Sequence, residues 1–166
     1  KIAHGRDASL QVGFTVQRSR YDELTYWSED ESVMGTKNMP RTPNCYGYFT
    51  FTAAPWKNFD FSLSGVYTGR MHVPHFAPTD EIPAGFPFTY ITKDELVHTP
   101  DFFDFNTKLN YTFVLNEHLK IQLNGGVQNI FNAFQKDLDK GTYRDSGYFY
   151  GPTQPRTFFI GIKLFN

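Results

Sequence analysis

The sequence has little of several features that define common protein classes. Its 166 residues include one cysteine, which excludes an internal disulfide framework and a cysteine-based zinc site. The formal net charge is -1, which argues against a nucleic-acid-binding protein because such proteins carry a basic patch. Mean hydropathy is -0.46, and no run of the sequence approaches the ~20 apolar residues of a membrane-spanning helix.

Motifs of familiar enzyme active sites are missing as well. The sequence contains no Gly-x-Ser-x-Gly, no His-Glu-x-x-His and no phosphate-binding loop. Cys45 has no evident catalytic partner and is expected to be a packing residue. We therefore predict a protein that is not an enzyme. Residues 1–7 contain no apolar segment of a signal peptide, so either a leader was removed or the chain begins inside a longer protein.

Aromatic residues, in contrast, are abundant. They make up 18% of the chain, with 18 Phe, 10 Tyr and 2 Trp. In a transmembrane β-barrel only alternate residues face lipid, so its mean hydropathy stays low while its aromatic content is high. The composition is therefore compatible with a β-barrel membrane protein.

Apolar and polar residues alternate with a period of two, the pattern of β-strands with two different faces. This pattern covers residues 9–17, 46–53, 59–68, 103–113, 119–128 and 157–165. In the last segment the alternation is less regular, and its two faces stay unassigned. No segment shows helical periodicity over three turns.

Strand length and loop length favour a barrel over a soluble β-sandwich, although alternation alone fits both. The segments are long enough for the ~9–11 residues of a tilted transmembrane strand, whereas strands of globular proteins cluster near ~5–6. Long connections at 22–43, 72–100 and 132–155 alternate with tight turns at 54–58 and 116–118. In outer-membrane barrels the long loops face the outside and the short turns face the periplasm.

Six strands are fewer than the ~8 of the smallest single-chain barrels, and an open sheet edge is not tolerated in lipid. Residues 1–166 are therefore expected to be the C-terminal part of a larger barrel. Aromatic residues near the strand ends are expected to form the girdles at the membrane interfaces: Tyr21, Trp56, Phe59, Tyr67, Phe102, Phe131 and Phe158.

The C-terminal third resembles the end of a TonB-dependent outer-membrane receptor. In that family the penultimate strand ends in Asn-Leu/Ile-Phe-Asp/Asn, and after a loop a Pro-Arg pair precedes a last strand that ends in an aromatic residue. Here Asn129-Ile-Phe-Asn132, Pro155-Arg156 and Phe165 occupy those places. Asn166 after the aromatic residue is a departure. The intervening residues 135–152 look like the version of Bacteroidetes-type receptors.

The resemblance implies an antiparallel 22-stranded transmembrane β-barrel in the bacterial outer membrane. Such receptors use TonB–ExbB–ExbD to import a scarce ligand, such as a ferric siderophore, haem, cobalamin or a glycan. The plug domain and the earlier strands would precede this chain. A passive porin or adhesion-type barrel is the alternative, and a soluble β-sandwich binding module is a third possibility.

Candidate ligand-binding residues lie in the long loops. Aromatic side chains would stack on the ligand, and His or Arg would anchor its polar groups; the residues are Trp27, His72, His75, Tyr143, Arg144 and Tyr148. His72, His75 and His98 could also bind haem or a metal, or simply be exposed. The loop aromatic residues could equally anchor a surface lipoprotein.

No cofactor is expected apart from a possible loop calcium at Asp137–Asp145. That segment has carboxylates at alternate positions and a glycine, but it lacks the closing Glu of an EF-hand. A solvated loop explains it as well.

Overall fold

The computed structural model describes residues 8–166. Residues 1–7, which the sequence analysis examined for a signal peptide, lie outside the described residues. All regular structure in the described part is β-strand, and adjacent strands pair antiparallel. The prediction of an all-β, antiparallel fold is confirmed. No helix in residues 8–166 is long and apolar enough to cross a membrane.

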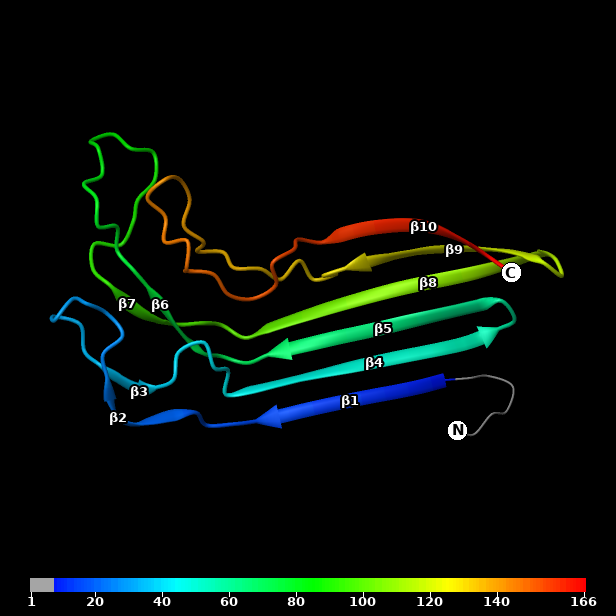
Figure 1. Ribbon diagram of the computed structural model, residues 1–166, viewed down its shortest axis with the longest axis horizontal. Helices are drawn as coiled ribbons and strands as arrows, with labels where there is room; N and C mark the ends of the chain where they lie inside the picture. Colours follow the sequence, from blue (N-terminus) through cyan, green and yellow to red (C-terminus); the bar gives the residue numbers. More distant parts are fainter. Residues whose placement is uncertain (1–7) are drawn as a thin grey trace.

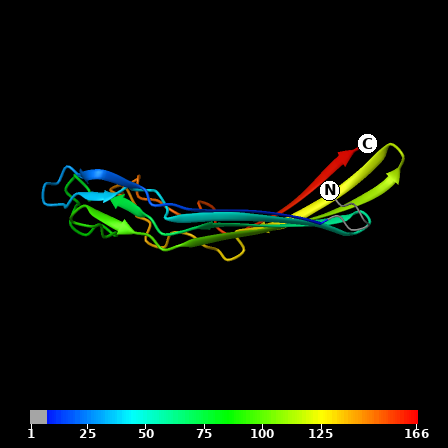
Figure 2. The ribbon, with the colours of Figure 1, turned by 90° about the horizontal axis from the view of Figure 1, so that it is seen from below.

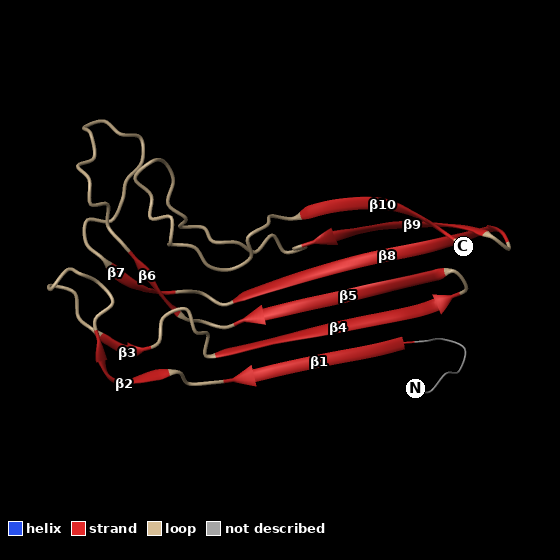
Figure 3. Ribbon diagram, in the orientation of Figure 1, coloured by secondary structure: helices blue, strands red, loops and turns tan. Residues whose placement is uncertain are grey.

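Six long strands form the main sheet in the order β1-β4-β5-β8-β9-β10 (Figures 1 and 3). Their bounds are β1 Ala8–Val16, β4 Cys45–Trp56, β5 Phe59–Thr68, β8 Phe102–Asn116, β9 Leu119–Gln128 and β10 Thr157–Phe165. The sheet is a single layer when seen edge-on (Figure 2). It does not close on itself within residues 8–166, because β1 and β10 each pair on one side only.

Two small hairpins lie within connections that the sequence predicted as long loops. β2 Arg20–Thr25 pairs with β3 Thr36–Asn38, and β6 His72–His75 pairs with β7 Glu95–His98. Both hairpins and the loop between β9 and β10 lie at one end of the sheet, and the tight turns lie at the other end (Figure 1). The predicted separation of long and short connections is therefore present.

The tight turn between β4 and β5 is shorter than the predicted 54–58. β4 continues through Pro55 to Trp56, and the register shifts between Ala53 and Trp56. A proline lacks the N–H that a ladder needs, so an irregular position of this kind accommodates it. The turn itself is Lys57 and Asn58, with Asn58 at a positive φ of 65°.

The strand register aligns the alternating residues into two continuous faces. One row across the sheet pairs Leu10 with Phe51, Phe51 with Leu63, Leu63 with Thr107, Thr107 with Val127, and Val127 with Phe158. This face is called the apolar face. Ile160, Ile162 and Leu164 share it, which settles the two sides of β10 that the sequence left unassigned.

The opposite side is called the polar face. One row across it contains Gln11, Thr50, Ser64 and Asn106, paired strand by strand. Phe102 also projects from this side, because it is paired with Thr68, and it is 8% exposed. Its predicted place in an exposed aromatic girdle is therefore wrong, since neighbouring residues of β8 alternate between the two faces.

The buried side chains gather among the long loops rather than on the main sheet's apolar face. Val73, Phe102, Tyr148 and Tyr150 form the hydrophobic core of the described residues. By contrast, large side chains of the apolar face are well exposed, with Ile160 at 86% and Val12 at 65%. The structured loop end and the uncovered apolar face are the two features that bear on function.

Candidate functional site

The loop between β9 and β10 packs against the β6–β7 hairpin around His75. This imidazole is 5% exposed, and its ring stacks on that of Tyr148 with a centroid separation of 3.6 Å and an angle of 6°. His75 Nε2 lies 2.9 Å from a carboxylate oxygen of Asp139, which fixes the ring by a hydrogen bond. His75 and Tyr148 thus join two loops that are far apart in the sequence.

The structure does not bring the three predicted histidines, His72, His75 and His98, together in one site. His72 and His98 are direct cross-strand partners with ring centroids 4.9 Å apart. Burial, together with the neighbouring His98, lowers the pKa of His72 from its ordinary value. His75 belongs to the buried side with Val73, at the far end of the hairpin from His98. No group of three His, Cys, Asp or Glu within residues 8–166 is placed to hold a metal ion.

The carboxylates of the proposed calcium segment are used by side chains of the same loop. The hydroxyl groups of Tyr148 and Tyr150 donate to the two oxygens of Asp137 at 2.6 and 2.5 Å. Desolvation raises the pKa of Asp137, but these hydrogen bonds outweigh it, and the pKa lies below its ordinary value. Desolvation and the same hydrogen bond raise the pKa of Tyr150 to about 12. Asp139 meanwhile accepts from His75 and from the N–H of Asp145.

An aromatic cluster joins the outer tips of the same two loops. The rings of Phe86 and Tyr143 meet edge to face at 5.1 Å, and Tyr90 lies 6.3 Å from Tyr143. Tyr90 also donates from its hydroxyl group to the carbonyl of Lys140 at 2.5 Å. Arg144 is exposed beside this cluster and donates to the carbonyl of Gly141.

Within residues 8–166, four of the six predicted ligand-binding residues lie at the loop end of the molecule without internal contacts that a ligand would have to break. Tyr143 and Arg144 line a hollow of about 320 Å³ together with Phe76. The ring of Trp27 lies 5.9 Å from that of Phe76, and His72 is half-buried. His75 and Tyr148 have internal contacts that a ligand would have to break, so packing explains them best.

Asn129 holds the two ends of the β9–β10 loop together. Its side-chain amide donates to the carbonyls of Ala133 and Gln154 at 2.9 and 2.8 Å, and its side-chain oxygen accepts from the N–H of Ala133. Its own N–H donates to Asn106 on β8 at 2.8 Å. Asn129 is 3% exposed and has a positive φ of 48°, which asparagine tolerates better than most residues. The first residue of the Asn129-Ile-Phe-Asn132 motif thus has a structural role, because it links the two ends of the loop.

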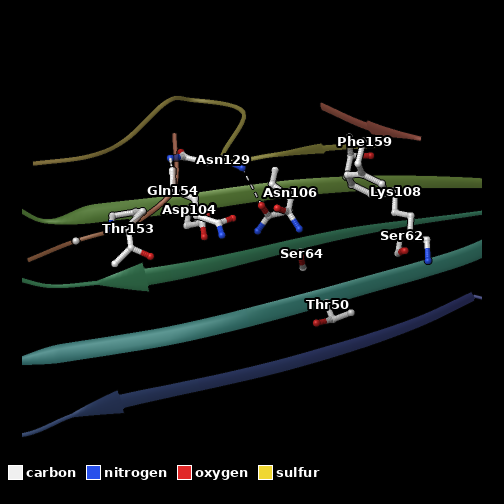
Figure 4. Close-up of a pocket in the computed structure, with 14 residues that line it drawn as sticks. Thr50, Ser62, Ser64, Asp104, Asn106, Lys108, Asn129, Thr153, Gln154 and Phe159 are labelled. Carbon is white, nitrogen blue, oxygen red and sulfur yellow. Dashed lines mark hydrogen bonds between the residues drawn. The ribbon is translucent and has the colours of Figure 1, made fainter. Parts of the chain in front are cut away.

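A second hollow lies on the polar face, where the β9–β10 loop folds over the sheet. It is an open hollow of about 700 Å³ that is lined by the strands and by residues 151–154 (Figure 4). Asp104, Asn106 and Lys108 line it along β8, and Thr153 and Gln154 line it from the loop. The size falls in the range of ~300–1,000 Å³ that is usual for ligand sites.

The sequence prediction missed this hollow. Its polar strand residues occupy the alternate positions of each strand that the pattern predicted, but no local pattern indicates where the loop returns to the sheet. The contact that brings the loop back, between Asn129 and Gln154, spans 25 residues. Local patterns cannot reveal such a contact.

Comparison with known protein families found no family model that matches the chain, and comparisons with curated proteins and with solved structures found no match either.

Proposed function

We propose that this chain is the C-terminal part of a transmembrane β-barrel in the bacterial outer membrane. The observation that carries the proposal is the uncovered apolar face of a single-layer sheet. Val12, Ile160 and Ile162 are 65%, 86% and 69% exposed. Burying one such side chain is worth ~1.5–3 kcal/mol, so a dozen of them left in water would forgo on the order of 20 kcal/mol. Lipid could cover this face without displacing any part of the described residues.

The open edges of the sheet support a larger barrel as the setting. The outer edges of β1 and β10 have no partner strand in residues 8–166. In lipid, each unsatisfied N–H or C=O would cost several kcal/mol. Further strands that pair with both edges would remove this cost, as in the 22-stranded barrels that the sequence resemblance implies.

The position of the long loops supports a receptor rather than a plain pore. The β6–β7 hairpin and the β9–β10 loop form a packed unit around Val73 and Tyr148, and hollows open beside it. We therefore propose a TonB-dependent receptor that imports a scarce, bulky nutrient such as a ferric siderophore, haem or cobalamin. The loops would face outward and bind the ligand, and TonB–ExbB–ExbD would act through a part of the protein that precedes this chain.

Fractionation and uptake assays on the full-length protein test this proposal. The protein is expected in the outer-membrane fraction, and uptake of its ligand should stop when TonB is deleted. Uptake that continues without TonB would support the passive porin instead. Recovery in the soluble fraction without detergent would contradict the membrane location and support a β-sandwich module.

A further inference from the structure

The base of the β6–β7 hairpin places two imidazole rings side by side. His72 on β6 and His98 on β7 are direct partners in the register, and their ring centroids lie 4.9 Å apart. Side chains at such opposite positions project on the same side of a strand pair, with Cβ atoms ~4.5–5.5 Å apart. His75 projects from the other side of β6, among buried residues. The structure therefore brings together two of the three histidines.

Both rings can be reached from the medium. His72 is half-buried and His98 is exposed. His75 differs from them, because its two ring nitrogens lie 2.9 Å from Asp139 and 3.6 Å from Glu95. Within residues 8–166, neither His72 nor His98 has a side-chain hydrogen bond or an ion pair of this kind. Their nitrogen lone pairs thus stay available to an ion.

The separation of the rings matches two adjacent ligands of one metal ion. An imidazole nitrogen binds Zn²⁺ at ~2.0–2.1 Å, which puts the ring centroid ~3.2 Å from the ion. Two imidazoles at the tetrahedral angle then have centroids ~5.2 Å apart, close to the observed 4.9 Å. Two axial ligands on opposite sides of a haem iron would have centroids ~6.4 Å apart. The pair therefore suits a small ion and not the iron of a haem.

Backbone hydrogen bonds hold the two residues in place. The N–H of Arg41 donates to the carbonyl of His72 at 2.7 Å. Beside the pair, the N–H of Thr99 donates to the carbonyl of Met71 at 2.9 Å, and the N–H of Met71 donates to the hydroxyl group of Thr99 at 3.2 Å. Thr99 is 1% exposed. Ligands that are positioned in advance lose less conformational entropy when an ion binds.

From this geometry we propose that His72 and His98 together bind one divalent transition-metal ion of the zinc, copper or nickel type. Imidazole is a preferred ligand of these ions, whereas Ca²⁺ and Mg²⁺ prefer oxygen ligands. Two protonated imidazoles at this separation would repel each other, which favours the neutral form that binds metals. Residues 8–166 place no third His, Cys, Asp or Glu beside the pair, so water completes the coordination.

The ion would link the two strands of a short hairpin. β6 and β7 have four residues each, and residues 76–94 form the long connection between them. An ion that binds only the folded hairpin stabilises it by mass action. The inference does not depend on the membrane proposal, because the pair and its supporting hydrogen bonds lie within residues 41–99.

Electron paramagnetic resonance of Cu²⁺–nitrilotriacetate with the full-length protein in detergent tests the inference. This chelate leaves adjacent positions open on the copper ion, so two neighbouring imidazoles should bind it, and the spectrum should show nitrogen couplings from both. His72→Asn or His98→Asn should weaken binding at this site by about a hundredfold, because a second ligand held beside the first acts at a high effective concentration.

A double variant and a control complete the test. The combined variant His72→Asn, His98→Asn should bind hardly more weakly than either single variant, since one substitution already removes the paired ligands. His118→Asn should leave binding unchanged, because His118 is exposed in the turn between β8 and β9, at the other end of the sheet (Figure 1). Near-ultraviolet circular dichroism checks that the loop core stays folded.

Equal copper binding by the wild type and by His98→Asn would overturn the inference. This variant decides even where His72→Asn disturbs the hairpin, because His98 is exposed. A low-spin haem spectrum that requires both histidines would overturn it as well, since the two rings would then lie on opposite sides of an iron.

Failure of this inference can be distinguished from failure of the proposed function. TonB-dependent uptake by a protein without the copper site would overturn the inference and leave the receptor standing. Copper binding through both histidines by a protein recovered in the soluble fraction would do the reverse.

Discussion

At the residue scale, Asn129 shows how one side chain can position a long loop. Its amide group forms three hydrogen bonds, two to Ala133 and one to Gln154, and its backbone N–H is held by Asn106. It is buried and has a positive φ. The position of the loop over the polar hollow therefore depends on a buried residue.

Asn129→Ala should lower the free energy of unfolding by about 3 kcal/mol, because three hydrogen bonds of ~1 kcal/mol each are lost. Asn132→Ala is a matched control, since Asn132 has a similar φ of 51° but a single side-chain hydrogen bond, to the N–H of Arg156. It should cost about 1 kcal/mol. Chemical denaturation of the two variants measures this difference. Equal losses of unfolding free energy would contradict the proposed role of Asn129 in holding the loop ends together.

Asp137 and Tyr150 should make the stability of this loop depend on pH at both extremes. The pKa of Asp137 is lowered, so its contribution is present above the ordinary value of 3.8 and is lost as pH falls through the lower folded value. The pKa of Tyr150 is raised to about 12, so its contribution is present below 10.0 and is lost as pH rises toward 12.

Ultraviolet titration of the phenolate checks the alkaline side. Tyr150 is expected to ionise later than the exposed tyrosines, and Asp137→Asn should bring its midpoint back toward 10.0, since the carboxylate no longer opposes a second negative charge. An unchanged midpoint in the Asp137→Asn variant would show that the carboxylate does not hold the hydroxyl group.

At the element scale, each strand of the main sheet presents two surfaces of opposite character. The alternation predicted all six long strands and, for five of them, which residues share a face. It could not place the sides of β10, where Phe158 and Phe159 are both aromatic, until the pairing with β9 fixed the register. The short hairpins β2–β3 and β6–β7 also escaped prediction. Their few residues carry no clear period, and tertiary contacts such as that between His75 and Asp139 stabilise them.

Neighbouring positions of β1 should respond differently to a charge. Val12→Lys places an ammonium group on the apolar face and should lower folding stability in a bilayer by about 2–4 kcal/mol. Gln11→Lys, one residue earlier on the polar face, should change it by less than about 0.5 kcal/mol. Urea titrations in lipid vesicles compare the two variants. Equal tolerance of both lysines would indicate that water covers the two faces alike.

At the scale of the whole molecule, the loop end has a hydrophobic core of its own, whereas the sheet has an exposed apolar face. The loops have a small core, and the sheet leaves its apolar face and its two outer edges uncovered. The sequence predicted the two-sided sheet and the gathering of long loops at one end. It could not predict the polar hollow, because the fold-back of residues 151–154 depends on contacts between distant residues.

Closure of the barrel in the full-length protein should protect the outer edge of β10. Alternate N–H groups of an edge strand point away from their one partner, and they exchange with solvent unless another strand accepts their hydrogen bonds. Hydrogen exchange is therefore expected to be slow at successive residues of β10. Fast exchange at every second residue would mean that this edge stays open.

In the full-length protein the apolar face is expected to contact lipid, and the polar face is expected to contact water. Spin labels at single cysteines along residues 121–124 of β9, in a background with Cys45→Ser, test it most directly. In bilayers, labels at Ile121 and Leu123 should collide with membrane-soluble oxygen, and labels at Gln122 and Asn124 with a water-soluble nickel chelate. Collisions with the two reagents should therefore alternate with a period of two along β9; collision of all four labels with the chelate alone would mean that water, not lipid, covers both faces.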